Sequence, residues 1–105
     1  MFARLSIYDN VDLELAEQVT QWHEAAETDP FRELPGYRGS MTLMDRDNAR
    51  IVGIGFYSSA GHAQEAEAVL AEMFEDGRAQ IPESIRPALD MQPANVGLYE
   101  VVQRD

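Results

Sequence analysis

The sequence predicts an α+β fold in which the elements follow one another in the order β-α-β-β-α-β. Two observations predict it: the spacing of apolar residues switches between a period of two and a helical period, and turn residues separate the segments. The 105 residues have the length of one domain, residues 1–105, and a hydrophobic fraction of 45% can supply its core. Two crossovers around a central hairpin give a ferredoxin-like, four-stranded antiparallel sheet with two helices on one face.

The first two elements are a strand over residues 3–9 and a helix over residues 11–27. The strand alternates, with Ala3, Leu5 and Ile7 on one side and Arg4, Ser6 and Tyr8 on the other. The apolar stripe of the helix comprises Leu15, Val19, Trp22 and Ala26. Pro30 ends the helix, because the residue before a proline avoids the α region.

A hairpin follows the helix. The turn Leu34-Pro35-Gly36 leads into a second strand over residues 37–45, and Asp47-Asn48 favours a tight reversal into a third strand over residues 51–58. Both strands contain β-branched, aromatic and long apolar residues. The sequence therefore predicts that these two strands pair directly.

The second helix and the last strand complete the order. Ser59 is the expected N-cap of a helix over residues 60–75, which Asp76-Gly77 would end. Its apolar stripe comprises Ala63, Ala66, Leu70 and Met73. A short helical turn is expected near residues 84–89, and a fourth strand over residues 95–103.

Both faces of the predicted sheet are largely apolar. The third strand places Val52, Ile54 and Phe56 on one side and Ile51 and Tyr57 on the other. Two helices can cover only one face, and the other would be a larger apolar patch than monomers usually expose. We therefore expect a homodimer in which two sheets pack face to face into an α/β barrel.

Composition excludes several classes of function. The net charge is −11, and the 8 basic residues are all arginine, so the chain is not expected to bind nucleic acid or an anionic membrane. There is no cysteine, which excludes disulfides, thiolate nucleophiles and iron–sulfur ligation and fits a cytoplasmic protein. The i, i+3 spacing of His62 and Glu65 supplies two potential ligands only, so no metal site is expected.

Four segments, in this order, resemble the antibiotic biosynthesis monooxygenase-like family of the dimeric α/β-barrel superfamily. They are the turn at residues 34–39, the acidic hairpin at 45–49, the strand end Tyr57-Ser58-Ser59 and the closing strand at 98–102. The resemblance implies a cytoplasmic bacterial homodimer that is a cofactor-independent monooxygenase acting on a small aromatic or polyketide-type substrate. The heme-binding histidine of some members has no counterpart near residues 65–67, so no cofactor is expected.

Six residues are candidates for the site. Tyr57 and His62 are the candidate catalytic residues, because a neutral imidazole beside a phenol could activate a substrate hydroxyl. The candidate substrate-binding residues are Trp22, His23, Gly53 and Gly55. The two glycines would leave room for a planar ligand, although strand glycines more often relieve crowding, and each of the other candidates has a purely structural interpretation.

Three functions stay open at this point. The chain is a small monooxygenase-like enzyme, a non-catalytic ligand-binding or stress-response barrel, or a module whose main role is dimerisation. The first two predict a cavity that reaches Tyr57 and His62, and the third predicts an interior filled by side chains.

Overall fold

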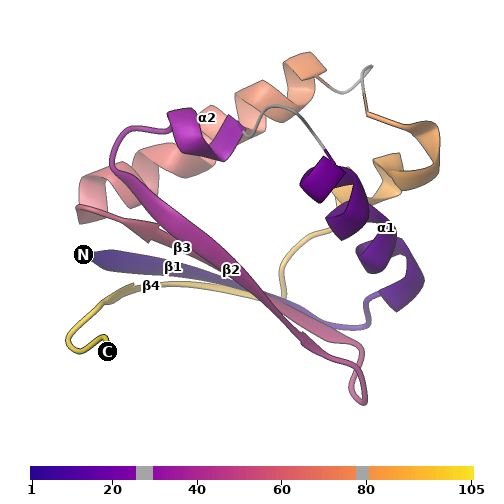
Figure 1. The fold of residues 1–105 in the computed structure, drawn as a ribbon, viewed down its shortest axis with the longest axis horizontal. Coiled ribbons are helices and arrows are strands. Elements are labelled where there is room, and N and C mark those ends of the chain that lie inside the picture. The colour runs from indigo at the N-terminus through magenta and orange to yellow at the C-terminus, as the bar shows by residue number, and fades with distance from the viewer. Residues whose placement is uncertain (26–29, 78–80) are drawn as a thin grey trace.

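The computed structural model describes residues 1–25, 30–77 and 81–105. The strands are β1 (Phe2–Tyr8), β2 (Tyr37–Asp45), β3 (Arg50–Tyr57) and β4 (Asn95–Glu100). The helices are α1 (Leu13–Ala25) and α2 (Ala60–Gly77), and the connections contain the 3-10 helices η1 (Pro30–Glu33) and η3 (Glu83–Asp90). This is the predicted β-α-β-β-α-β order (Figure 1).

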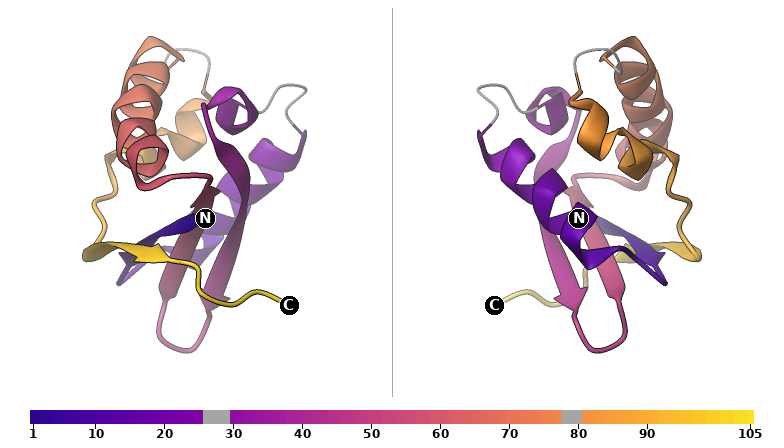
Figure 2. Two further views of the ribbon diagram at one scale, coloured as in Figure 1. Left: turned by 90° about the vertical axis from the view of Figure 1, so that its left-hand side faces the viewer. Right: turned by 90° about the vertical axis from the view of Figure 1, so that its right-hand side faces the viewer.

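The four strands form one antiparallel sheet in the order β2-β3-β1-β4. The central pair, β1 and β3, places Leu5 opposite Ile54, and β1 places Leu5 opposite Gly97 of β4. Both helices lie on the same side of this sheet (Figures 1 and 2). The structure thus confirms the predicted ferredoxin-like α+β fold.

The predicted signals at the element ends are confirmed in three places. Ser59 caps α2, because its hydroxyl accepts a hydrogen bond from the His62 backbone N–H at 3.1 Å. Strand β2 has the predicted bounds, and the hairpin turn is held by Asn48, whose side-chain amide donates to Asp45 at 2.8 Å. This bond and one from the Asn48 backbone lower the pKa of Asp45.

The register decides which residues face the helices. On β1 and β3, the helix side of the sheet carries Phe2, Arg4, Ser6, Tyr8, Ile51, Gly53, Gly55 and Tyr57, with Met44, Val96 and Leu98 from the neighbouring strands. The opposite side, here called the outer side, carries Ala3, Leu5, Ile7, Val52, Ile54 and Phe56, with Met41, Leu43 and Tyr99 from the neighbouring strands. Both sides therefore carry large apolar side chains, and the helix side also carries the polar residues Arg4 and Ser6.

The tightest packing on the helix side lies between α2 and the end of β3. Tyr57 is 3% exposed and packs with Leu34, Ala63 and Ala66. The two alanines let α2 approach the sheet closely. Their burial confirms the predicted apolar stripe of α2 at Ala63 and Ala66. Tyr37 meets Tyr57 edge to face, with ring centroids 6.1 Å apart.

Helix α1 lies at the other end of the sheet and packs mainly against η3 (Figure 1). Asp12 caps it by accepting hydrogen bonds from the backbone N–H groups of Glu14 and Leu15. The predicted apolar stripe is less buried than expected, because no residue of α1 is fully buried and Trp22 is 36% exposed. Ala26, the last residue of that stripe, lies outside the described residues. No helix within the described residues is long and apolar enough to cross a membrane.

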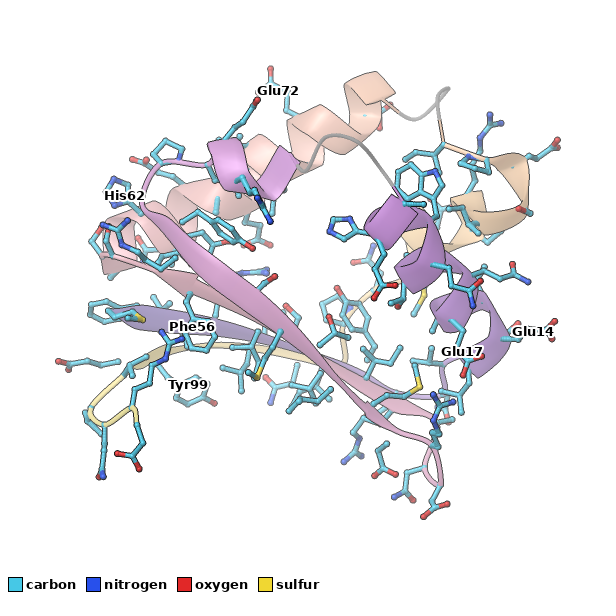
Figure 3. All side chains as sticks on the ribbon, viewed as in Figure 1. Glu14, Glu17, Phe56, His62, Glu72 and Tyr99 are labelled. Carbon is cyan, nitrogen blue, oxygen red and sulfur yellow. The ribbon has the colours of Figure 1, made fainter. Side chains whose placement is uncertain are left out.

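No helix among the described residues covers the outer side. Met41, Leu43 and Tyr99 are 50%, 49% and 56% exposed, and Tyr99 points away from the helices (Figure 3). The C-terminal residues cross one end of this side, where the Arg104 guanidinium lies 5.1 Å from the centre of the Phe56 ring. The rest of the outer side faces solvent in the single chain.

Candidate functional site

Two open clefts lie between the helices and the sheet. The α2 cleft, of about 210 Å³, is lined by Arg4, Ala63, Gln64, Glu67, Val96, Gly97 and Leu98. The α1 cleft, also of about 210 Å³, is lined by Tyr8, Ala16, Val19, Thr20, Thr42, Ile51, Ala88 and Met91. Along β1 and β3 the floor between the two clefts is formed by Ser6 and its register partner Gly53. The sheet residues beneath the helices therefore combine small or polar residues with larger apolar ones such as Ile51 and Leu98.

The charged group of the α2 cleft is Arg4, in the central strand. Its side chain is 23% exposed and donates to the hydroxyl of buried Ser6 at 3.1 Å. A second guanidinium nitrogen lies 3.3 Å from the carboxylate of Glu67, whose side chain is 69% exposed. A half-buried guanidinium on an otherwise largely apolar wall is suited to hold an oxyanion.

Tyr57 lies beside Arg4 on the helix side of the sheet. Its ring folds back over Gly55, where an added Cβ would meet the ring at 3.0 Å. Gly55 therefore makes room for Tyr57, whereas Gly53 has no atom within 4 Å of the position of a Cβ and leaves open space. Tyr57 belongs to the core cluster and is not among the residues that line either cleft.

The environment of Tyr57 keeps its hydroxyl protonated. Burial raises the pKa of Tyr57 above its ordinary value of 10.0, the Arg4 charge lowers it in part, and Tyr37 raises it. At neutral pH Tyr57 is therefore a hydrogen-bond donor and not a base.

This raised pKa makes stability depend on alkaline pH. The folded state holds the Tyr57 proton more tightly than the unfolded state, so the contribution is complete below the unfolded pKa of 10.0 and is lost as pH rises through the folded pKa. We expect the free energy of unfolding in urea to fall as the pH rises above about 10. Tyr57→Phe should flatten this decline, and equal slopes for the two proteins would contradict the assignment.

His62 lies at the corner where β2, β3 and α2 meet, at the opposite end of the sheet from α1 (Figure 3). Its Nδ1 atom lies 3.1 Å from the Ser58 hydroxyl and 2.9 Å from the Ser59 hydroxyl. Its ring also packs against Gly36. Tyr57 and His62 thus have separate sets of neighbours, and His62 is not among the residues that line either cleft.

Trp22 and His23 lie in the last turn of α1 and are both exposed. Neither lines the α1 cleft, whose α1 residues are Ala16, Val19 and Thr20. The structure therefore brings Tyr57, Gly53 and Gly55 together on one side of the sheet and leaves His62, Trp22 and His23 away from them.

Sequence reasoning missed Arg4, Ser6 and Glu67. The alternation of β1 placed Arg4 and Ser6 on one side, but alternation does not reveal which side of an amphipathic strand the helices cover. The sequence does contain one signal for this site: an arginine lies in the middle of a short central strand, with a serine two residues later. Within the described residues, no group of three or more histidine, cysteine, aspartate or glutamate side chains could hold a metal ion.

No protein-family model matches the chain, and no curated protein matches it. Among solved structures, it is similar to a protein from Deinococcus radiodurans described as a "putative antibiotic biosynthesis monooxygenase". The TM-score is 0.53 at 12% sequence identity, and the match covers 100% of this chain and 96% of that chain. At this identity the likeness concerns the fold, and it shows that the chain has an antibiotic biosynthesis monooxygenase-like, ferredoxin-type architecture.

Proposed function

We propose that this chain is a member of the antibiotic biosynthesis monooxygenase-like family that binds a small aromatic or polyketide-type hydroxy compound in the α2 cleft. The observation that carries the proposal is the position of Arg4, a charged residue of the central strand that lines the α2 cleft beside Val96 and Leu98. Its side chain is 23% exposed and donates to the hydroxyl of buried Ser6. A filled, purely structural core would place an apolar side chain at this position.

The proposed reaction is oxidation by molecular oxygen without a cofactor. Arg4 stabilises the oxyanion that forms when a substrate hydroxyl loses its proton to water at the open mouth of the cleft. The electron-rich anion then reduces oxygen. A ring C–H and the O–H are lost, one oxygen atom enters the ring as a quinone carbonyl, and the other leaves as water, which balances four electrons.

Oxygen uptake with 1-naphthol tests the reaction. The protein should consume one oxygen molecule for each naphthoquinone formed, and Arg4→Gln should lower the rate at least about tenfold. Arg104→Gln removes the same charge from the outer side, where Arg104 lies over the Phe56 ring, and should keep the wild-type rate. No oxygen uptake across a panel of phenols and quinols would refute the enzymatic proposal.

A non-catalytic ligand-binding barrel is the second candidate, and the position of His62 favours it. The His62 ring is held by two serine hydroxyls and by Gly36, away from the Tyr57 ring over Gly55. Without a base beside the bound hydroxyl, the cleft would bind and release its ligand unchanged. The expected sign is a saturable rise in melting temperature with 1-naphthol and no oxygen uptake.

The proposed assembly is a homodimer formed through the outer side of the sheet. Nine apolar residues face outward, and they come from all four strands. In β4 the outward positions of Asn95 and Gly97 carry no apolar side chain. A single chain leaves three of them about half exposed, which is unfavourable in water. Packing two outer sides together would bury these residues and leave both α2 clefts accessible.

A further inference from the structure

The α2 cleft combines one cation with an apolar wall. Arg4 reaches it from the central strand, and Ala63, Val96 and Leu98 supply apolar surface around it. A guanidinium has five N–H donors, of which the contacts to Ser6 and Glu67 engage two nitrogens. A flat apolar ligand with a group that accepts hydrogen bonds from Arg4 would match both parts of this lining.

Glu67 holds the place that such a group would take. Its carboxylate meets Arg4 through one contact of 3.3 Å, and its side chain, in the middle of α2, is 69% exposed. An ion pair with so exposed a partner is weak, because water screens it and the long side chains lose freedom. An anion held inside the cleft could form two parallel bonds with the guanidinium, which are stronger and more directional.

We propose that the ligand of the α2 cleft is an anion, an aromatic carboxylate or an ionised phenol, that binds Arg4 in place of the Glu67 carboxylate. This inference rests on the proposed ligand-binding function. It adds that the bound ligand carries a negative charge. In this role Glu67 is a competitor that excludes weakly binding anions, and Arg4 is the specificity-determining residue. The overall charge of −11 repels anions at a distance, so the selectivity must come from this local pair.

The test compares three flat probes of similar size at pH 7. The probes are 2-naphthoate, the neutral 2-naphthol and uncharged 2-methylnaphthalene, and their affinities are measured by titration calorimetry on the full chain. We expect 2-naphthoate to bind at least about tenfold more tightly than 2-methylnaphthalene. A second arm with 4-nitrophenolate at pH 8 distinguishes an ionised phenol from a carboxylate by which of the two anions binds more tightly.

Two matched variants separate the local pair from the general charge. Glu67→Gln should tighten 2-naphthoate binding about fivefold, because the competing carboxylate is gone. Glu65→Gln removes the same charge from an exposed position of α2 that does not line the cleft, and should change the affinity by less than twofold. Arg4→Gln should weaken 2-naphthoate at least tenfold and leave 2-methylnaphthalene unchanged.

The outcomes distinguish a failure of the anion proposal from a failure of the proposed ligand-binding function. Equal tightening by Glu67→Gln and Glu65→Gln would overturn the proposed exchange, because only long-range charge would then be acting. Binding of all three probes with equal affinity would overturn the anion preference and leave the cleft as a binding site. Binding of none of them would overturn the cleft itself. The expected pattern without oxygen uptake would support the inference and refute only the oxidation.

Discussion

Replacement of Met41 and Leu43 together by aspartate is expected to convert a dimer into a monomer of 11.8 kDa. Both residues face the outer side from β2 and are 50% and 49% exposed in the single chain, so the monomer itself loses little burial. In the proposed dimer each aspartate would bury an unpaired carboxylate, which costs several kcal/mol. A total of about 4 kcal/mol raises the dissociation constant roughly a thousandfold.

Sedimentation velocity at micromolar concentration measures this change. The matched control is the double variant Ser40→Asp and Thr42→Asp, which adds the same two charges to the helix side of the same strand. The control should remain a dimer. A wild-type protein that sediments as a monomer would refute the proposed assembly, and so would a control that dissociates as readily as the test variant.

Substitution of Gly36 by alanine is expected to cost about 2–4 kcal/mol of unfolding free energy. Gly36 has a φ of +73°, which is strained for any residue with a Cβ. The added atom would also lie 2.5 Å from His62 Cγ and 2.7 Å from the Ser58 hydroxyl. Ser58 cannot move freely, because its backbone N–H donates to the Gly36 carbonyl at 2.8 Å.

The control for backbone strain alone is Gly39→Ala. Gly39 also has a positive φ, +113°, but nothing lies within 4 Å of the position of its Cβ. Urea unfolding at one protein concentration should therefore show a loss of only about 1 kcal/mol for Gly39→Ala. Adding His62→Ala to Gly36→Ala should recover the part of the steric loss that the imidazole causes. Equal costs for the two glycine variants would contradict this account of the corner.

The sequence predicts the elements of this fold well where short-range signals act. Ser59 caps α2 and Asp45 with Asn48 closes the hairpin, because these contacts join residues three positions apart. The stripe of α1 is predicted less well. Periodicity places Trp22 on the apolar side of the helix, but whether that side is buried depends on how closely the helix approaches the sheet. In the structure α1 packs mainly against η3, a contact that the helix's own periodicity does not reveal.

The candidate site was predicted in part. Gly53 and Tyr57 occupy the helix side of the sheet, as a pocket there requires, but the importance of Arg4 depends on which side the helices cover. Alternation along a strand is the same for both answers. His62 was paired with Tyr57 because of its proximity in the chain. The structure shows that the turn at Gly36 holds the imidazole instead.

The open space at Gly53 would let the proposed ligand site vary. A Cβ added there meets no atom within 4 Å, so alanine would alter the shape of the floor without disturbing neighbouring side chains. The outer side, which carries the proposed contact between copies, lies on the opposite surface of the same strand. Selection could therefore change the preferred ligand at Gly53 and independently keep the contact between copies at the neighbouring outward positions of the same strand.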